Sequence, residues 1–119
     1  MRISVFGLGY VGAVSGACLA DMGHYVVGVD VDSFKVGAIN QGQSPIVEEL
    51  IAELMQSAVA AGRLRATTEV GEAVAATELS LVCVGTPSTT GGGLDTAYVQ
   101  RVSEQIGEAL KSKAEYHVV

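Results

Sequence analysis

Three glycines near the start of the chain have the spacing of a turn that binds a phosphate group. They are Gly7, Gly9 and Gly12, in the segment Gly-Leu-Gly-Tyr-Val-Gly. In this pattern the first glycine permits a tight turn, the second leaves room for a pyrophosphate, and the third lets a helix approach a strand closely. The free amides at the start of that helix would face the anion. The pattern alone is a weak signal in a chain with 15 glycines among 119 residues, so its context decides.

Asp30 supplies the second part of the expected chemistry. It closes an apolar run at residues 25–29 and lies 18 residues after Gly12, near the spacing of about 20 that is typical of dinucleotide-binding domains. A carboxylate there would accept hydrogen bonds from the adenosine ribose and repel a 2′-phosphate, which favours NAD over NADP. The alternative is that the glycines only form a turn and that Asp30 is an exposed residue at a strand end.

Two further polar residues stand where they could contact such a cofactor. Lys35 falls in the first turn of the helix expected after Asp30, within reach of the adenosine end, although most lysines in such a place are solvated. Thr86 follows the apolar run 79–84 and so falls at the edge of the sheet where ligands bind in α/β folds. A threonine that merely belongs to a turn is an equal interpretation.

The cysteines and histidines do not indicate a catalytic group. Cys18 and Cys83 each lie in an apolar stretch, which is typical of small core side chains in a reducing compartment. His24 and His117 flank expected strands and have no cluster of partners in the sequence. We therefore assign no catalytic residue and no metal ligand.

Apolar runs and glycines define the elements that must position these residues. We expect strands at residues 2–6, 25–29, 64–67 and 79–84, and a last strand at 116–119 that begins and is cut off. Helices are expected at residues 10–22, 32–42, 46–61, 70–76 and 95–110. This alternation predicts an α/β fold with a Rossmann-like, doubly wound parallel sheet, truncated within its last strand, in one domain over residues 1–119.

Apolar residues recur at helical spacing in three of these helices. In the first helix they are Val11, Val14, Cys18, Leu19 and Met22. In the helix at residues 46–61 the apolar stripe comprises Ile51, Leu54, Met55 and Ala58, and in the last helix the expected buried face comprises Tyr98, Val102, Ile106 and Leu110.

Charge and composition argue against several classes of partner. The chain has 7 basic and 13 acidic residues, a net charge of −6, with no basic run, so nucleic acid and anionic membranes are not expected partners. With 49% apolar and 17% charged residues it can bury a core, and we expect a cytoplasmic protein. The uncharged run at residues 3–20 imitates a signal peptide, but glycines interrupt it and an apolar strand follows.

Four segments together carry a family resemblance. They are Phe-Gly-Leu-Gly-Tyr-Val-Gly at residues 6–12, Gly-Val-Asp-Val-Asp at 28–32 with Lys35, Ser-Pro-Ile-Val-Glu at 44–48, and Cys-Val-Gly-Thr-Pro-Ser at 83–88. The chain resembles, over essentially its whole length, the N-terminal NAD-binding domain of the UDP-glucose/GDP-mannose dehydrogenase family. The segment at 44–48 is most similar to the GDP-mannose 6-dehydrogenase branch. The resemblance implies NAD as cofactor, with Tyr10 and Val11 at the pyrophosphate, Asp30 and Lys35 at the adenosine end, and Thr86 near the reactive half.

The resemblance also implies an activity. Enzymes similar to this chain oxidise GDP-mannose to GDP-mannuronate in two NAD-dependent steps for polysaccharide biosynthesis, using a catalytic cysteine in a further domain that binds the nucleotide-sugar substrate. We expect that domain to be absent here and the chain alone to be inactive. The alternatives are a UDP-glucose 6-dehydrogenase fragment and a stand-alone NAD-binding regulatory module without catalysis.

Two features of the chain have structural consequences. The family usually continues the Val-Glu segment with Pro-Gly-Leu, whereas Glu49-Leu50-Ile51 stand here and allow the next helix to begin early. A sheet that stops inside its next strand leaves an unpaired apolar edge, so we expect a homo-oligomer.

Overall fold

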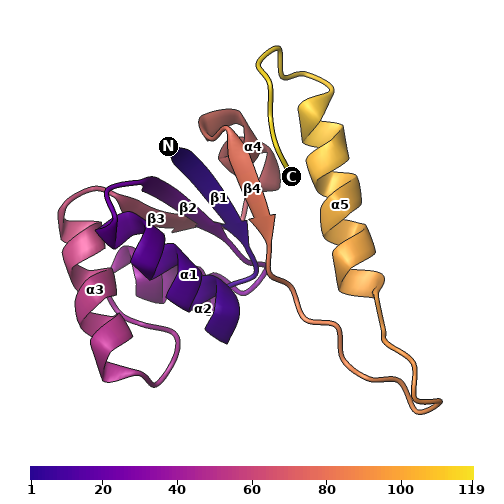
Figure 1. Cartoon of the computed structure of the whole chain (residues 1–119), viewed down its shortest axis with the longest axis horizontal. Helices are drawn as coiled ribbons and strands as arrows, with labels where there is room; N and C mark the ends of the chain where they lie inside the picture. Colours follow the sequence, from indigo (N-terminus) through magenta and orange to yellow (C-terminus); the bar gives the residue numbers. More distant parts are fainter.

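The computed structural model describes residues 1–119 and contains a parallel sheet with helices on both faces (Figure 1). Its four strands, in the order β3-β2-β1-β4, are β1 (Arg2–Phe6), β2 (Tyr25–Val29), β3 (Leu64–Thr67) and β4 (Leu79–Val82). All three strand pairs are parallel. Because parallel strands end at the same edge of a sheet, the loops after β1, β2 and β4 meet there. The predicted Rossmann-like α/β fold is confirmed.

Helices cover the two faces of the sheet unequally. The helices α1 (Tyr10–Asp21), α2 (Ser33–Asn40) and α3 (Glu49–Ala60) share a core of 13 buried residues with one face. The helices α4 (Val70–Ala76) and α5 (Ala97–Leu110) pack on the other face around a core of 6 buried residues that includes Phe6. Strands that are buried on both faces require nearly continuous apolar runs, as the sequence has.

The helix predicted at residues 10–22 is confirmed as α1, but the face that packs on the sheet consists of small residues. Its buried residues are Gly12, Ala13, Gly16, Ala17 and Ala20. Of the larger apolar residues whose spacing indicated the helix, Val11 and Met22 are exposed, and Val14, Cys18 and Leu19 are only partly buried. Small side chains let the helix lie close to the strands, and the larger apolar residues then point sideways or outward.

The start of α3 also differs from the prediction, since the helix begins at Glu49 instead of residue 46. The Ser44 hydroxyl donates to the Ile46 carbonyl at 2.9 Å and accepts from the Ile46 amide at 3.2 Å. Such side-chain bonds to the backbone compete with helix formation, so this segment forms a local turn. Ile51, Met55 and Ala58 are buried as predicted, and Leu54 is partly buried against them.

The first turn of α5 lies beyond the end of β4 (Figure 1). β4 ends at Val82, two residues earlier than predicted, and the chain continues as a loop to the N-cap residue Thr96. Ile106 is buried, and Val102 and Leu110 are partly buried, in agreement with the prediction. Tyr98 is 51% exposed, which contradicts the prediction.

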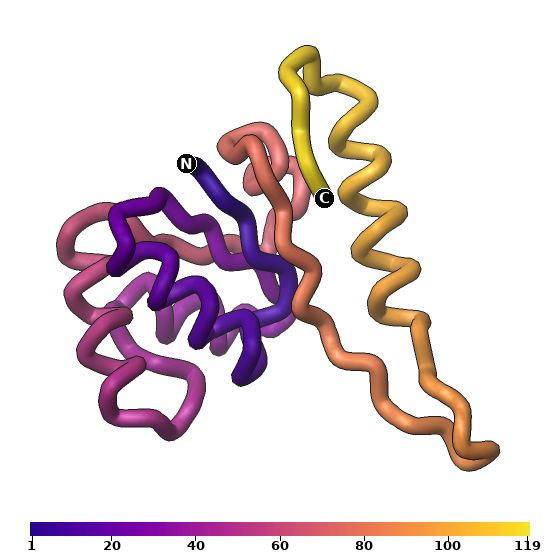
Figure 2. The backbone as a smooth tube through the Cα atoms, in the orientation of Figure 1, coloured from indigo at the N-terminus to yellow at the C-terminus, as the bar shows by residue number.

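After α5 the chain turns back and runs beside β4 (Figure 2). Val118 forms a parallel bridge with Leu79. The Ser80 amide donates to the Val118 carbonyl at 2.8 Å, and the Val118 amide donates to the Glu78 carbonyl at 3.1 Å. The strand predicted at residues 116–119 is thus a single bridge at the outer edge of β4.

Three linked, buried hydroxyl groups lie on β1, at the end of α4 and on β4, and the one on β4 contacts the returning segment. Ser4, Thr77 and Ser80 are each at most 2% exposed. The Ser80 Oγ atom lies 2.7 Å from Ser4 Oγ and 2.8 Å from Nε2 of His117, and Thr77 Oγ1 lies 3.0 Å from Ser4 Oγ. The three hydroxyls and the imidazole therefore satisfy one another inside the protein.

Lys113 and the Thr77 carbonyl both contact the imidazole of His117. The Lys113 ammonium donates to the carbonyls of Val74 and Thr77 and lies 2.8 Å from Nδ1 of His117. The Thr77 carbonyl oxygen lies 3.2 Å from the same Nδ1 atom. The ammonium can only donate to Nδ1 and the carbonyl can only accept from it, so the two contacts belong to different tautomers of the imidazole. Burial, reinforced by the positive charge of Lys113, lowers the pKa of His117 below its ordinary value of 6.5, although a hydrogen bond to Thr77 opposes this. The same ammonium ties the end of α5 to the end of α4.

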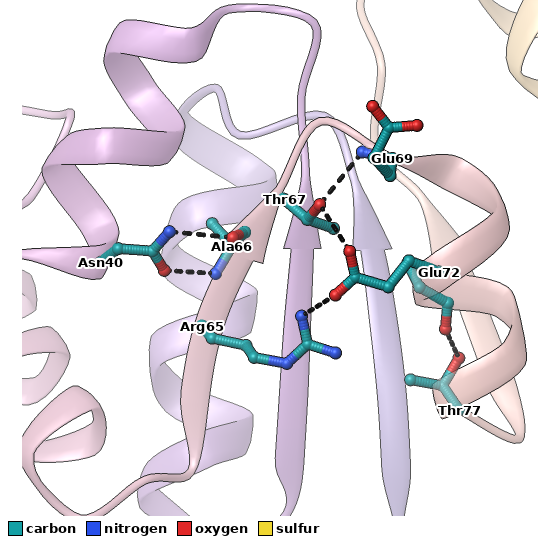
Figure 3. Close-up of polar contacts among 8 residues, drawn as sticks. Asn40, Arg65, Ala66, Thr67, Glu69, Glu72 and Thr77 are labelled. Carbon is teal, nitrogen blue, oxygen red and sulfur yellow. Dashed lines mark hydrogen bonds and ion pairs between the residues drawn. The ribbon is translucent and has the colours of Figure 1, made fainter.

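β3 forms the edge of the sheet opposite to β4, and a side chain of α2 pairs with its backbone at one position (Figure 3). Asn40, the last residue of α2, accepts from the Ala66 amide at 2.8 Å and donates to the Ala66 carbonyl at 2.9 Å. Next to it, Arg65 and Glu72 form an ion pair at 2.5 Å that joins β3 to α4. Both charged side chains are about half exposed, so we expect the pair to add little stability. Asn40 thus occupies the hydrogen-bonding groups that an added strand would use at this position.

Candidate dinucleotide-binding site

The turn after β1 requires glycine at two of the predicted positions. Gly7 has φ +96°, and a Cβ atom there would lie 2.8 Å from the Cys83 carbonyl oxygen. A Cβ atom on Gly12 would lie 1.7 Å from the Gly7 carbonyl oxygen, which no packing adjustment accommodates. Gly12 therefore allows α1 to begin directly against the turn, as the spacing of the motif predicts.

Gly9 has a different environment, because a Cβ atom there would have no neighbour within 4 Å. Gly9 is the N-cap residue of α1, and because glycine has no side chain, it cannot accept a hydrogen bond from the first amides of the helix. The amides of Tyr10, Val11 and Gly12 have no hydrogen-bond acceptor within the chain. Open space in front of unpaired amides at the positive end of a helix is a suitable environment for a phosphate group.

Asp30 connects the end of β2 to the glycine turn. Its Oδ2 atom accepts from the Leu8 amide at 2.8 Å and its Oδ1 atom accepts from the Asp32 amide at 2.9 Å. A carboxylate has about four acceptor sites, so each oxygen can still accept a ribose hydroxyl. The two backbone bonds hold the carboxylate in a fixed orientation at the mouth of the site.

A cavity of about 300 Å³ lies at the carboxyl edge of the sheet. Among the predicted residues, Gly7, Gly9, Asp30 and Lys35 line this cavity. Its remaining walls come from the ends of β1, β2 and β4, the start of α4 and the first nine residues of α5; they are Phe6, Val29, Val31, Thr68, Val70, Cys83, Val84, Gly85, Tyr98, Arg101, Val102 and Gln105. The topology thus gathers residues from five separate segments at one place.

Four predicted residues do not line the cavity. Gly12 is buried in the first turn of α1. Tyr10 and Val11 are 64% and 63% exposed at the first turn of α1, where their amides rather than their side chains face the site. Thr86 is exposed in the loop after β4, one residue beyond the cavity-lining Gly85. The structure therefore gives Thr86 no contact with the cavity.

The contribution of α5 is absent from the sequence prediction. Tyr98, Arg101 and Gln105 are separated by three and four positions, so they share one face of the helix. This polar stripe beside the apolar one is the signal that could have identified them. The prediction instead assigned Tyr98 to the core.

The Cys83 thiol lines the cavity but is poorly suited to be a nucleophile. It is partly buried, and desolvation raises the pKa of the thiol above its ordinary value of 9.0. The neutral thiol therefore dominates at neutral pH, in agreement with a structural role. Cys18 is the second free cysteine and belongs to the flank of α1.

The fold and this site define a dinucleotide-binding domain of the Rossmann type. Residues 1–119 match the domain described as UDP-glucose/GDP-mannose dehydrogenase family, NAD binding domain, and the chain belongs to that family. NAD is thus the cofactor of this domain. The clear space at Gly9, the unpaired amides of α1 and the carboxylate of Asp30 fit a pyrophosphate joined to an unphosphorylated ribose.

Similar proteins agree with this assignment. The chain is 57% identical over 119 residues to GDP-mannose 6-dehydrogenase of Azotobacter vinelandii, covering 100% of this chain and 27% of the relative. UDP-glucose 6-dehydrogenase of Rhizobium meliloti is 46% identical over 112 residues, covering 93% of this chain and 26% of the relative. A ternary complex of GDP-mannose dehydrogenase from Pseudomonas aeruginosa superposes with a TM-score of 0.97 at 51% identity, covering 99% of this chain and 27% of that one.

The chain is much shorter than these relatives, since it spans 27% of the length of the Azotobacter vinelandii enzyme. Among the helices described above, none has both the length and the apolar character needed to cross a membrane.

Proposed function

We propose that this chain is the cofactor-binding part of an NAD-dependent nucleotide-sugar 6-dehydrogenase that acts on GDP-mannose. The observation that carries the proposal is the glycine turn held by the Asp30 carboxylate beside unpaired amides of α1. The higher identity to a GDP-mannose 6-dehydrogenase, 57% against 46% for a UDP-glucose 6-dehydrogenase, favours GDP-mannose as the substrate of the whole enzyme.

Each site residue has a separate task in this proposal. The Tyr10 and Val11 amides bind the pyrophosphate, Asp30 binds the adenosine ribose and Lys35 contacts the adenosine end. Thr86 serves the reactive half of the cofactor from its exposed position in the loop. When bound, NAD supplies the hydride acceptor for oxidation of the substrate C6 alcohol to the carboxylate of GDP-mannuronate.

The proposal leaves sugar binding and covalent catalysis to a further part of the enzyme. Cys83 is the thiol nearest the cofactor site, and its raised pKa opposes a role as the nucleophile. We therefore propose that the chain alone is inactive, and that the whole enzyme works in the cytoplasm in polysaccharide biosynthesis. Nucleic acid and membranes are not proposed partners.

We further propose a homo-oligomer. The bridge at Val118 covers only one position along the outer edge of β4. Tyr116 and Val119 remain 87% and 63% exposed beside it. Sedimentation at tens of micromolar would show an assembly larger than the 12.2 kDa monomer, and a single monomeric species would contradict this part of the proposal.

A chimeric enzyme tests the proposed activity. The chain would replace the matching quarter of the Azotobacter vinelandii GDP-mannose 6-dehydrogenase, and NADH formation would be followed with GDP-mannose and with UDP-glucose. We expect oxidation of GDP-mannose by the chimera and none by the isolated chain. A folded chimera that binds NAD but oxidises neither sugar nucleotide, or turnover by the isolated chain, would contradict the proposal.

A further inference from the structure

One wall of the cofactor cavity is formed by polar side chains of α5 that have no partners in the chain. Arg101 and Gln105 line the cavity together with Tyr98, and none of the three forms a side-chain hydrogen bond or ion pair. Three other basic side chains are engaged, since Arg65 pairs with Glu72, Lys111 with Glu108, and Lys113 binds two carbonyls. Lys35, on the opposite side of Asp30 in the sequence from the glycine turn, is the second cavity-lining cation without a partner. Arg101 is therefore a cation at the cavity whose hydrogen-bonding groups are all available to a ligand.

The size of the cavity restricts what it can accept. Its volume of about 300 Å³ is at the lower limit of the range of roughly 300–1,000 Å³ for small-molecule sites, too little for both nucleosides of a dinucleotide. The Asp30 carboxylate lines it and is the group that binds the adenosine ribose in this fold. The part of the cofactor that fits the cavity is therefore the adenine ring with its ribose.

The walls of the cavity suit the two faces of a purine. Apolar side chains from the sheet and from α4 line its inner side, among them Phe6, Val29 and Val70. Arg101 lies across from them on α5. A guanidinium is planar and weakly hydrated, and it stacks on aromatic rings, whereas a lysine ammonium does so less well. An apolar inner wall and an unpartnered guanidinium on the facing helix are complementary to a flat aromatic ring.

We propose that Arg101 binds the adenine ring of the cofactor, with its guanidinium plane against the purine face. Tyr98 and Gln105, one turn to either side, contact the ring edge. This inference rests on the proposed function in that it takes NAD as the ligand. Arg101 contributes to the affinity for the adenine half of NAD and not to the affinity for the nicotinamide half.

Lys113 supports this arrangement from the far end of the helix. Its ammonium binds the carbonyls of Val74 and Thr77, and so holds α5 against the end of α4. Because a helix moves as a rigid element, this contact also sets the distance between Arg101 and the apolar wall.

Calorimetric titrations of NAD and AMP into the wild-type chain, Arg101→Met and Arg101→Lys test the proposal. Arg2→Met is the matched control, since Arg2 is exposed at the start of β1, at the amino ends of the strands and away from the cavity at their carboxyl ends. We expect Arg101→Met to weaken the binding of NAD and of AMP by the same factor, between about 2-fold and 30-fold, which is the range of a cation–π contact. Arg101→Lys should recover less than half of the loss in free energy, and Arg2→Met should bind as the wild type does.

The outcomes separate this inference from the proposed function. Wild-type affinity in Arg101→Met would overturn the role of Arg101 and leave NAD binding by the domain intact. Full recovery by Arg101→Lys would show that Arg101 pairs with a phosphate charge, which also overturns stacking. Failure of the wild-type chain to bind NAD would contradict both. In NMR spectra, addition of AMP should shift the Arg101 Nε proton upfield because of the purine ring current, and an unshifted proton at saturation would contradict the proposed contact.

Discussion

The amide of Leu8 donates to Oδ2 of Asp30 at 2.8 Å, which joins the middle of the glycine turn to the end of β2. The same carboxylate accepts from the Asp32 amide at 2.9 Å through its other oxygen. Asp30 therefore organises the turn in addition to offering acceptors to a ribose. A change of this residue alters the shape of the site before any cofactor is added.

Substitution Asp30→Ala should lower stability in the absence of NAD. Two backbone amides lose a charged acceptor, and a hydrogen bond to a charged group contributes about 1.5–3 kcal/mol. We expect the free energy of unfolding in urea to fall by about 2 kcal/mol, together with loss of NAD binding. Lost binding at unchanged stability would show that the carboxylate serves only the ribose.

Alanine at Gly12 and at Gly9 should have opposite effects. The Gly12→Ala methyl group would collide with the Gly7 carbonyl, so we expect a loss of at least about 3 kcal/mol in urea unfolding. The Gly9→Ala methyl group meets no atom of the chain and should cost at most about 1 kcal/mol at an N-cap. This methyl group enters the space in front of the α1 amides and should weaken the binding of NAD by about tenfold or more. A Gly9→Ala variant with wild-type affinity would contradict the assignment of the pyrophosphate position.

Stability should decrease in mild acid because of His117. Its pKa is lowered in the folded protein by burial and by Lys113, so the unfolded chain binds this proton more tightly. The contribution of the neutral imidazole to stability is fully present above pH 6.5. It is lost as the pH falls from 6.5 through the lowered pKa of His117 in the folded state. Urea unfolding across this window should show a slope in the wild type that His117→Gln removes and His24→Gln retains. An equal slope in His117→Gln would assign the effect to other groups.

Substitution Lys113→Met should act on both stability and titration. It leaves the carbonyls of Val74 and Thr77 without their donor, which should cost about 1–3 kcal/mol. It also removes the positive charge that lowers the pKa of His117, so the pKa should rise toward its ordinary value. NMR titration of the imidazole protons measures this shift. A pKa that stays unchanged would mean that burial alone lowers it.

The sequence could predict the first βαβ unit almost to the residue, because its determinants are local. Gly7 and Gly12 interrupt the apolar pattern at the turn, and Asp30 marks the end of β2. The buried face of α1 could not be predicted from large apolar residues, since close packing on the sheet selects Ala13, Ala17 and other small residues.

The far wall of the cavity depends on information that the local sequence does not contain. Whether Tyr98 belongs to the core or to a site depends on where β4 ends relative to α5, and β4 is two residues shorter than its apolar run indicates. The contact between Ser4 and Ser80 spans 76 positions, that between Ser80 and His117 spans 37, and that between Lys113 and Thr77 spans 36. Only the folded chain brings these groups together.

A calorimetric titration with NAD shows whether the glycine turn and Asp30 form a working NAD site in this chain. We expect saturable binding that is markedly weaker for NADP, because the Asp30 carboxylate repels a 2′-phosphate. A chain that unfolds cooperatively in a circular dichroism melt but gives no heat of binding with NAD, or that binds NADP equally well, would contradict the assignment of this site.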